Sequence, residues 1–250
     1  MIILEACSNS VRSSIEAQKG GAQRVELCDN LAEGGTTPSL SQIELSRKFL
    51  NIKLYPIIRP RGGDFLYTDI EFETMKQDIH HCGKTKCDGV VIGILNPEGS
   101  IDKRRNKELI DIAHSYKMGV TFHRAFDRCN NLEKALEDII ELGCERILTS
   151  GGKKTALEGK EIIKDLIKQA KNRIIIMPGA GITENNISEL VGTTGLKEFH
   201  GSFQSRYNSE MKFISENIDS YQDEYTILLT DKNKVKQAIK NANSANKLIN

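Results

Sequence analysis

The sequence predicts an α/β fold, one (β/α)8 barrel of the TIM type that spans residues 1–250 as a single domain. Short runs rich in β-branched residues alternate with longer segments of helical periodicity, as in proteins built from βα units. The alternation occurs eight times, and eight such units favour a closed barrel over an open doubly wound sheet. The loop after the first expected strand also lacks a G-x-G-x-x-G pattern, which argues against a dinucleotide-binding fold.

The eight expected strands start 22 to 35 residues apart, so each interval holds a strand, a loop and one helix. Ser8 or Asn9 is expected to cap the first helix, and Gly20-Gly21 is expected to end it. The strands are expected to start near Ile2, Arg24, Lys53, Asp88, Gly119, Glu145, Arg173 and Lys197.

The C-terminal part departs from this rhythm. Residues 201–230 form a long expected loop after the eighth strand, and residues 231–248 form the last expected helix, with Thr230-Asp231 supplying its N-cap. Long βα loops lie at the mouth of a barrel and often carry function. A lid over the site, a dimer contact and irregular packing are all compatible with this segment.

The composition is that of an ordinary globular protein, with 38% hydrophobic and 28% charged residues. The net charge of +1 gives no electrostatic reason to expect a nucleic acid or an anionic membrane as partner. No apolar run approaches the roughly 20 residues that span a bilayer, and Glu5 comes too early for a signal peptide. The six scattered cysteines follow no zinc or secreted-scaffold spacing, so a cytoplasmic protein with reduced thiols is expected.

Two neighbouring strands end in the same Glu-x-Cys pattern. Glu5 and Cys7 share one face of the first strand, and Glu26 and Cys28 share one face of the second. Adjacent strands lie about 4.8 Å apart, so the two thiols can approach closely enough for a soft metal such as Cu(I) or for a disulfide. The alternative is that both cysteines are small buried hydrophobes and both glutamates are salt-bridged.

Three further strand ends place polar side chains at the same mouth. Arg59 follows the third strand, where its guanidinium suits a carboxylate or phosphate ligand, or neutralises Glu5 or Glu26. His123 ends the fifth strand and His200 ends the eighth, and both can titrate near neutral pH. A single histidine at a strand end is often structural. Here polar groups converge from five strands and indicate a candidate catalytic site, which consists of Glu5, Glu26, Arg59, His123 and His200.

Glycine-rich turns follow the sixth and seventh strands and expose backbone N–H groups. Loops at this end of a barrel often bind phosphate, although tight turns need glycine in any case. The residues that we expect to bind an anion are Arg61, Ser150, Gly151, Gly152, Gly179, Gly181 and Ser202.

Several of these segments together resemble the CutC family of copper homeostasis proteins. The resemblance implies a cytosolic TIM-type barrel that forms homo-oligomers, usually dimers, and that is linked to cellular copper. It also implies Cu(I) ligation by Cys7 and Cys28, whereas Phe203 departs from the small residue expected after His-Gly-Ser. The matching motifs are Glu-Ala-Cys (5–7), Gly-Gly-Ala-x-Arg-Val-Glu-Leu-Cys (20–28), Glu-Gly-Gly-Thr-Thr-Pro-Ser (33–39), Pro-Ile-Ile-Arg-Pro-Arg-Gly-Gly-Asp-Phe (56–65), Asp-Gly-Val-Val-Ile-Gly (88–93), Thr-Phe-His-Arg-Ala-Phe-Asp (121–127), Ile-Leu-Thr-Ser-Gly-Gly (147–152), Met-Pro-Gly-Ala-Gly-Ile (177–182) and Phe-His-Gly-Ser (199–202).

Three functions therefore remain open from the sequence. The first is a protein that holds Cu(I) between Cys7 and Cys28. The second is an isomerase- or lyase-type enzyme that uses acid–base chemistry on a small anionic, phosphorylated or unphosphorylated, substrate. The third is a barrel that acts mainly as an interaction scaffold, which the ring of polar side chains at its mouth argues against.

Overall fold

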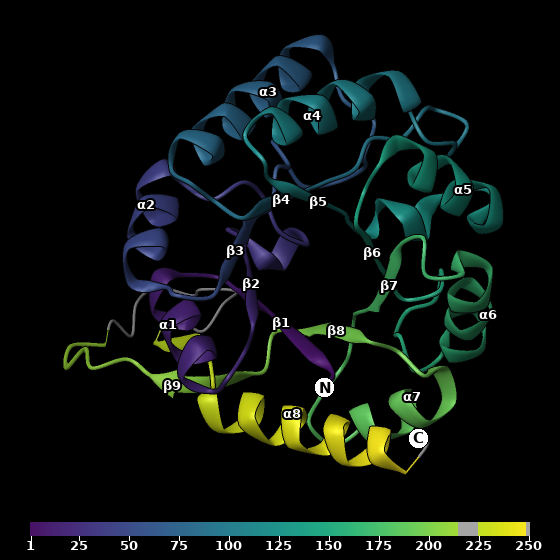
Figure 1. Ribbon diagram of the computed structural model, residues 1–250. Coiled ribbons are helices and arrows are strands. Elements are labelled where there is room, and N and C mark those ends of the chain that lie inside the picture. Colours follow the sequence, from purple (N-terminus) through teal and green to yellow (C-terminus); the bar gives the residue numbers. More distant parts are fainter. Residues whose placement is uncertain (215–224, 249–250) are drawn as a thin grey trace.

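The computed structural model describes residues 1–214 and 225–248, and it confirms the predicted α/β barrel. Eight parallel strands form the inner wall, and helices surround them (Figure 1). Each strand starts within two residues of its predicted position. The strands are β1 (Ile3–Ser8), β2 (Arg24–Leu27), β3 (Lys53–Pro56), β4 (Gly89–Ile92), β5 (Gly119–Phe122), β6 (Arg146–Thr149), β7 (Ile175–Pro178) and β8 (Glu198–Gly201).

The wall consists of two four-stranded sheets, in the orders β3-β2-β1-β8 and β4-β5-β6-β7. A parallel bridge between Ile57 and Val91 joins β3 to β4, and β7 lies beside β8 on the other side of the ring (Figure 1). The register of β1 sets the functional site, because it places Cys7 opposite Glu26 on β2 and Glu5 opposite His200 on β8.

The helices form because each has one apolar face that packs on the strands. In α5 the buried side chains recur at helical spacing; they are Ala135, Leu136, Ile139 and Leu142. Full burial of each leucine or isoleucine side chain among them contributes roughly 1.5–3 kcal/mol to stability. The helices are α1 (Val11–Lys19), α2 (Leu40–Phe49), α3 (Asp69–Lys84), α4 (Lys103–Ser115), α5 (Leu132–Leu142), α6 (Lys160–Ala170), α7 (Ile187–Thr194) and α8 (Lys232–Lys247), with short 3-10 turns η1 (Leu31–Glu33) and η2 (Arg124–Arg128).

The ends of α1 show how the local sequence sets a helix. Its N-cap is Ser10, whose side chain accepts a hydrogen bond from the Ser13 amide, so the prediction of Ser8 or Asn9 as the cap was wrong. Ser8 is still part of β1, because the strand continues to Ser8 and the helix starts only at Val11. Gly20 ends the helix as predicted.

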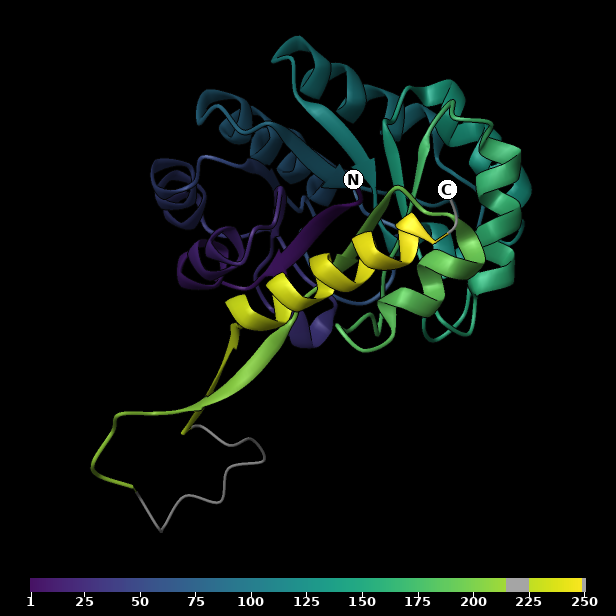
Figure 2. The same ribbon diagram turned by 60° about the horizontal axis from the view of Figure 1, so that its bottom comes forward.

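The segment expected as a loop over residues 201–230 contains a β-hairpin in its described part. Strands β9 (Gln204–Asn208) and β10 (Thr226–Thr230) pair antiparallel and project away from the barrel (Figure 2). Residues 215–224 of the expected loop lie outside the described residues. The last helix, α8, then packs between α7 and α1 and completes the outer ring (Figure 1), with Asp231 as its N-cap.

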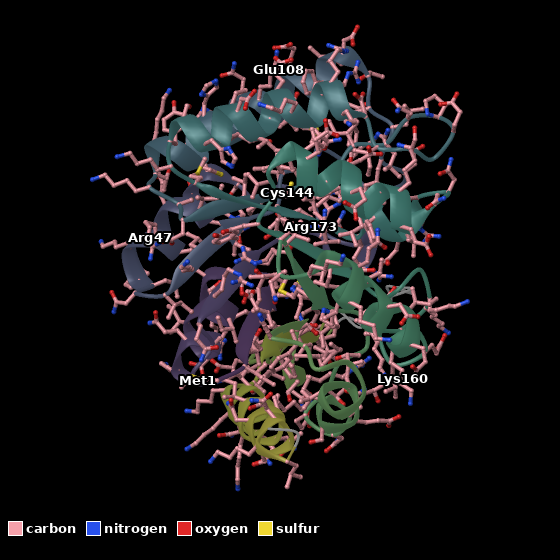
Figure 3. The ribbon with its side chains drawn as sticks, turned by 45° about the vertical axis from the view of Figure 1, so that its right-hand side comes forward. Met1, Arg47, Glu108, Cys144, Lys160 and Arg173 are labelled. Atoms are coloured by element: carbon pink, nitrogen blue, oxygen red, sulfur yellow. The ribbon has the colours of Figure 1, made fainter. Side chains whose placement is uncertain are left out.

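Charged side chains are concentrated on the outer helices, with Arg47, Glu108 and Lys160 at the periphery (Figure 3). Within residues 1–214 and 225–248, none of the helices combines the length and the apolar character needed to cross a bilayer.

Candidate functional site

A layer of paired charges fills the barrel interior beneath the mouth. We call Glu5, Arg24, Arg146 and Glu198 the ion layer; each is at most 4% exposed. Arg24 donates to both glutamates, and Arg146 Nε donates to Glu198 Oε2 at 3.2 Å. Burial alone would raise the pKa of Glu5, but Arg24 and His200 together hold it well below its usual range. Two cations therefore balance two carboxylates inside the barrel.

Tyr55 extends this layer toward the bottom of the barrel. Its hydroxyl donates to Glu145 Oε1 at 2.5 Å, and burial is the main reason why its pKa is raised above the usual value. The guanidiniums of Arg24 and Arg146 lie 5.5 and 5.3 Å from the centre of its ring. The barrel is therefore filled below the mouth, and side chains above this level line the site.

Four side chains above the ion layer form what we call the thiol–histidine cluster: Cys7, Cys28, Glu26 and His200. The two sulfurs lie 3.9 Å apart. His200 Nδ1 donates to Glu5 Oε1 at 2.8 Å, which directs Nε2 to within 3.6 Å of Glu26 Oε2. The ligand atoms of Cys7, Glu26 and His200 all lie within 4.8 Å of one another.

Burial and mutual contacts shift the proton affinities of the cluster. The pKa of Cys7 falls to about 5, because Cys28 donates a hydrogen bond to it and His200 lies close by. The same contact and burial raise the pKa of Cys28. Burial, reinforced by the Cys7 charge, raises the pKa of Glu26 to about 8, whereas hydrogen bonds to Cys7 and Glu5 outweigh burial and raise the pKa of His200. At neutral pH the cluster thus pairs a Cys7 thiolate with a His200 imidazolium, beside a neutral Glu26.

The cluster forms one wall of a cavity of about 510 Å³ at the carboxyl ends of the strands. Another part of the wall carries Arg59, Phe65 and His123, and apolar side chains such as Ile57 and Leu148 also line the cavity. Gln204, the first residue of β9, also lines the cavity, so the root of the hairpin reaches the site.

His123 and Arg59 have different surroundings from those of the cluster. His123 Nδ1 accepts a hydrogen bond from the Ala125 amide at 3.2 Å, while its buried Nε2 has no partner among the described residues. Burial and the charge of Arg59 lower the pKa of His123 to about 3, so the ring is neutral. Arg59 itself donates to the backbone carbonyls of Glu33, Gly35 and Gly63 at 2.7–2.8 Å rather than to Glu5 or Glu26.

The residues predicted to bind an anion do not all lie at one place. Gly181 and Ser202 line the cavity, and Gly179 lies against Leu148 and His200. Arg61 instead pairs with Glu71 at 2.6 Å and with Asp64 at 3.0 Å.

The turn at Ser150, Gly151 and Gly152 already holds an anion of the protein itself. The amides of Ser150 and Gly152 donate to the carboxylate of Asp127 at 2.9–3.1 Å, while the Gly151 amide bonds to Thr149. An external anion at this turn would have to displace Asp127.

Sequence reasoning missed Arg146, Glu198 and Asp127. Side chains alternate between the two faces of β8, so Glu198 shares the inward face with His200 two residues later, and its position inside the barrel could have been predicted. Arg146 stands in the same relation to Leu148 on β6. Asp127 had no such signal, because its partners come from the next βα loop.

The CutC family profile matches residues 2–205 of this chain. The chain belongs to the CutC family. A CutC family protein of Parabacteroides distasonis is 47% identical over 242 residues, which cover 95% of this chain and 99% of that protein. The human copper homeostasis protein cutC homolog is 44% identical over 238 residues, covering 94% of this chain and 86% of that protein.

A solved structure agrees with this assignment, and a second one shares the fold. The crystal structure of a protein assigned as copper homeostasis protein CutC, from Streptococcus agalactiae, matches with a TM-score of 0.77 and 36% identity, over 81% of this chain and 99% of that one. A phosphoribosylanthranilate isomerase from Thermotoga maritima matches at a TM-score of 0.58 and 12% identity, over 98% of this chain and 100% of that one. At that identity the isomerase shares only the fold with this CutC family member.

Proposed function

We propose that this CutC family protein binds Cu(I) through the thiolates of Cys7 and Cys28. The observation that carries the proposal is the 3.9 Å separation of the two buried sulfurs. Thiolates are the protein ligands that favour Cu(I). With metal–sulfur bonds of about 2.3 Å, this separation sets an S–metal–S angle of about 115°, which is close to trigonal and leaves a third position open.

His200 is the donor that we propose for the third position. Its Nδ1 bond to Glu5 leaves Nε2 facing Cys7 and Glu26. A carboxylate that holds the far nitrogen of a ligating histidine fixes the ring and raises its basicity. The buried Glu5, itself held by Arg24, supplies such a carboxylate. The name of the human relative, a copper homeostasis protein, supports copper as the ion.

Competition for Cu(I) against a high-affinity chromophoric chelator, without oxygen, tests this proposal. The wild type is expected to take up one ion, and Cys7→Ala/Cys28→Ala is expected to take up none. Cys129→Ala/Cys144→Ala is the matched control, since it also removes two of the six free thiols, from outside the cavity. Equal binding by both double variants would refute the site.

Acid–base catalysis in the same cavity is the second candidate function. The raised pKa of Glu26, about 8, keeps a proton on a carboxyl group beside His200, which suits a general acid. NMR analysis of a metabolite extract incubated with protein tests for turnover. Conversion by the wild type that is lost in Glu26→Gln would support an enzyme, and an unchanged extract would count against it.

We also propose a cytoplasmic homodimer. All six cysteines are free, in keeping with a reducing compartment. Tyr207 and Ile227, which pair across the β9–β10 hairpin, are 40% and 46% exposed, and they give one face of the hairpin an apolar surface suited to a second copy. Light scattering is expected to give a dimer for the wild type and a monomer for Ile227→Lys. A monomeric wild type would refute the dimer.

A further inference from the structure

The cavity is much larger than a metal site requires. A single ion at the thiol–histidine cluster occupies one corner of about 510 Å³. Liquid water takes about 30 Å³ per molecule, so the remaining space corresponds to more than a dozen waters. Cavities of this size usually take small organic molecules.

His123 supplies a hydrogen-bond donor that faces no acceptor. Because its Nδ1 accepts the Ala125 amide and the ring is neutral, its one hydrogen lies on Nε2. That atom is buried and has no partner in the described part of the chain, although His123 lines the cavity. A buried donor without an acceptor is destabilising, so a ligand that offers an oxygen there removes an existing cost.

The charge on the same wall is positive. Arg59 is 4% exposed, and among the described residues no carboxylate lies within salt-bridge distance of it. Its guanidinium stacks at 4.9 Å on Phe65, and the Phe65 ring lies 4.9 Å from His123. One cation without an anion, next to one free donor, suits a ligand with a single negative charge.

A carboxylate fits this wall better than a phosphate does. A dianionic phosphate is usually held by several donors, and the turn at residues 150–152 that offers them is filled by Asp127. Phe65, Ile57 and Leu148 give the rest of the cavity an apolar lining for the body of an organic molecule.

We propose that the cavity binds a small organic carboxylate, one oxygen of which accepts the hydrogen bond from His123 Nε2 while its body lies against Phe65. The site stands beside the thiol–histidine cluster but does not depend on a bound metal. It therefore goes beyond the proposed copper function and can fail or succeed separately from it.

Calorimetry on metal-free, reduced protein tests the proposal with the monocarboxylates benzoate, lactate and butyrate as probes. Benzamide and phenyl phosphate are the neutral and dianionic counterparts of benzoate. At least one of the three carboxylates is expected to bind. If benzoate binds, its affinity is expected to be at least tenfold higher than the affinities of benzamide and phenyl phosphate. No measurable binding of any of the three carboxylates, or equal binding of benzamide, would overturn the proposal.

Two variants assign the binding to His123. His123→Asn keeps an acceptor near the Nδ1 position but has no atom where Nε2 stands, so carboxylate binding is expected to weaken about 10- to 100-fold. His123→Gln places an amide N–H near the Nε2 position and is expected to retain most of the affinity. Equal affinity in wild type and His123→Asn, both folded by circular dichroism, would refute the role of His123.

A third variant separates the two sites. Cys7→Ala/Cys28→Ala is expected to bind the carboxylate as the wild type does, even though the proposed copper site is gone. Carboxylate binding that disappears with the thiols would overturn the independent site. Loss of copper alone, or absence of copper from the wild type, bears only on the proposed copper function.

Discussion

Replacing Arg24 by methionine tests the ion layer, because the new side chain keeps much of the volume and removes the charge. Arg24 is 2% exposed and donates to both Glu5 and Glu198. After the substitution Glu198 keeps Arg146, but the ion layer retains one positive and two negative groups. Removing one partner from a buried ion pair costs about 3–5 kcal/mol.

That loss corresponds to a large fall in melting temperature. For a chain of 250 residues, 1 kcal/mol shifts Tm by about 2–4 °C, so Arg24→Met is expected to melt about 6–20 °C lower than the wild type. The chain has no tryptophan, so far-ultraviolet circular dichroism is the suitable signal.

Arg173→Met is the matched control, because Arg173 makes two hydrogen bonds of 2.7 and 2.8 Å to Glu137 on the surface of the protein. Both partners are more than 40% exposed, and such pairs contribute about 0–1 kcal/mol. A melting temperature of Arg24→Met within 3 °C of that of Arg173→Met would show that the ion layer does not stabilise the fold.

Three other sets of substitutions test the histidine ligand, the buried His123 and the packing at two glycines. Glu5→Gln and His200→Asn are each expected to weaken Cu(I) binding about 10- to 100-fold in the chelator competition, and unchanged affinity in both would exclude His200 as a ligand. His123 has its folded-state pKa lowered to about 3, against about 6.5 when unfolded, so the unfolded state gains its proton first as the pH falls. Stability is therefore lost as the pH falls from about 6.5 toward 3, and at pH 5 the free energy of unfolding is lower by about 2 kcal/mol. In urea unfolding, the difference in free energy of unfolding between pH 7 and pH 5 is expected to be smaller for His123→Asn than for the wild type. An equal difference in the two proteins would contradict the assignment to His123. Gly20→Ala places a Cβ 2.6 Å from Val235 Cβ and is expected to cost about 1–3 kcal/mol, whereas Gly192→Ala in α7 meets nothing within 4 Å and is expected to stabilise by about 0.5–1 kcal/mol; thermal melts that rank them the other way would refute the packing argument.

The barrel was predictable because its signals are local and repeated. Each βα unit carries its own apolar strand and amphipathic helix, so the start of every strand could be placed within two residues. The inward alternation of barrel strands also predicted that Glu5, Cys7, Glu26, Cys28 and His200 meet at one mouth. The structure brings the last four together in the cluster and places Glu5 in the ion layer beneath them, bonded to His200.

What the sequence did not predict depends on contacts between distant segments. The pairing of Arg24 with both Glu5 and Glu198 requires the register of three strands, which no local pattern specifies. Arg59 pointed to the same mouth by alternation, yet its donors are taken by carbonyls of a loop more than 20 residues earlier. The β9–β10 hairpin was missed because its paired segments are short and stand outside the βα rhythm.

Glu5 belongs to two systems at once, since one oxygen accepts from Arg24 and the other from His200. Exchanging a buried ion network for well-packed hydrophobic side chains often makes a protein more stable by about 1–4 kcal/mol. Here the same redesign would release the imidazole ring from its fixed orientation above the barrel floor. Selection for more thermostable variants of this chain would thus act against Glu5, the residue that orients His200. A substitution of Glu5 that raises thermostability is therefore expected to weaken ligand binding.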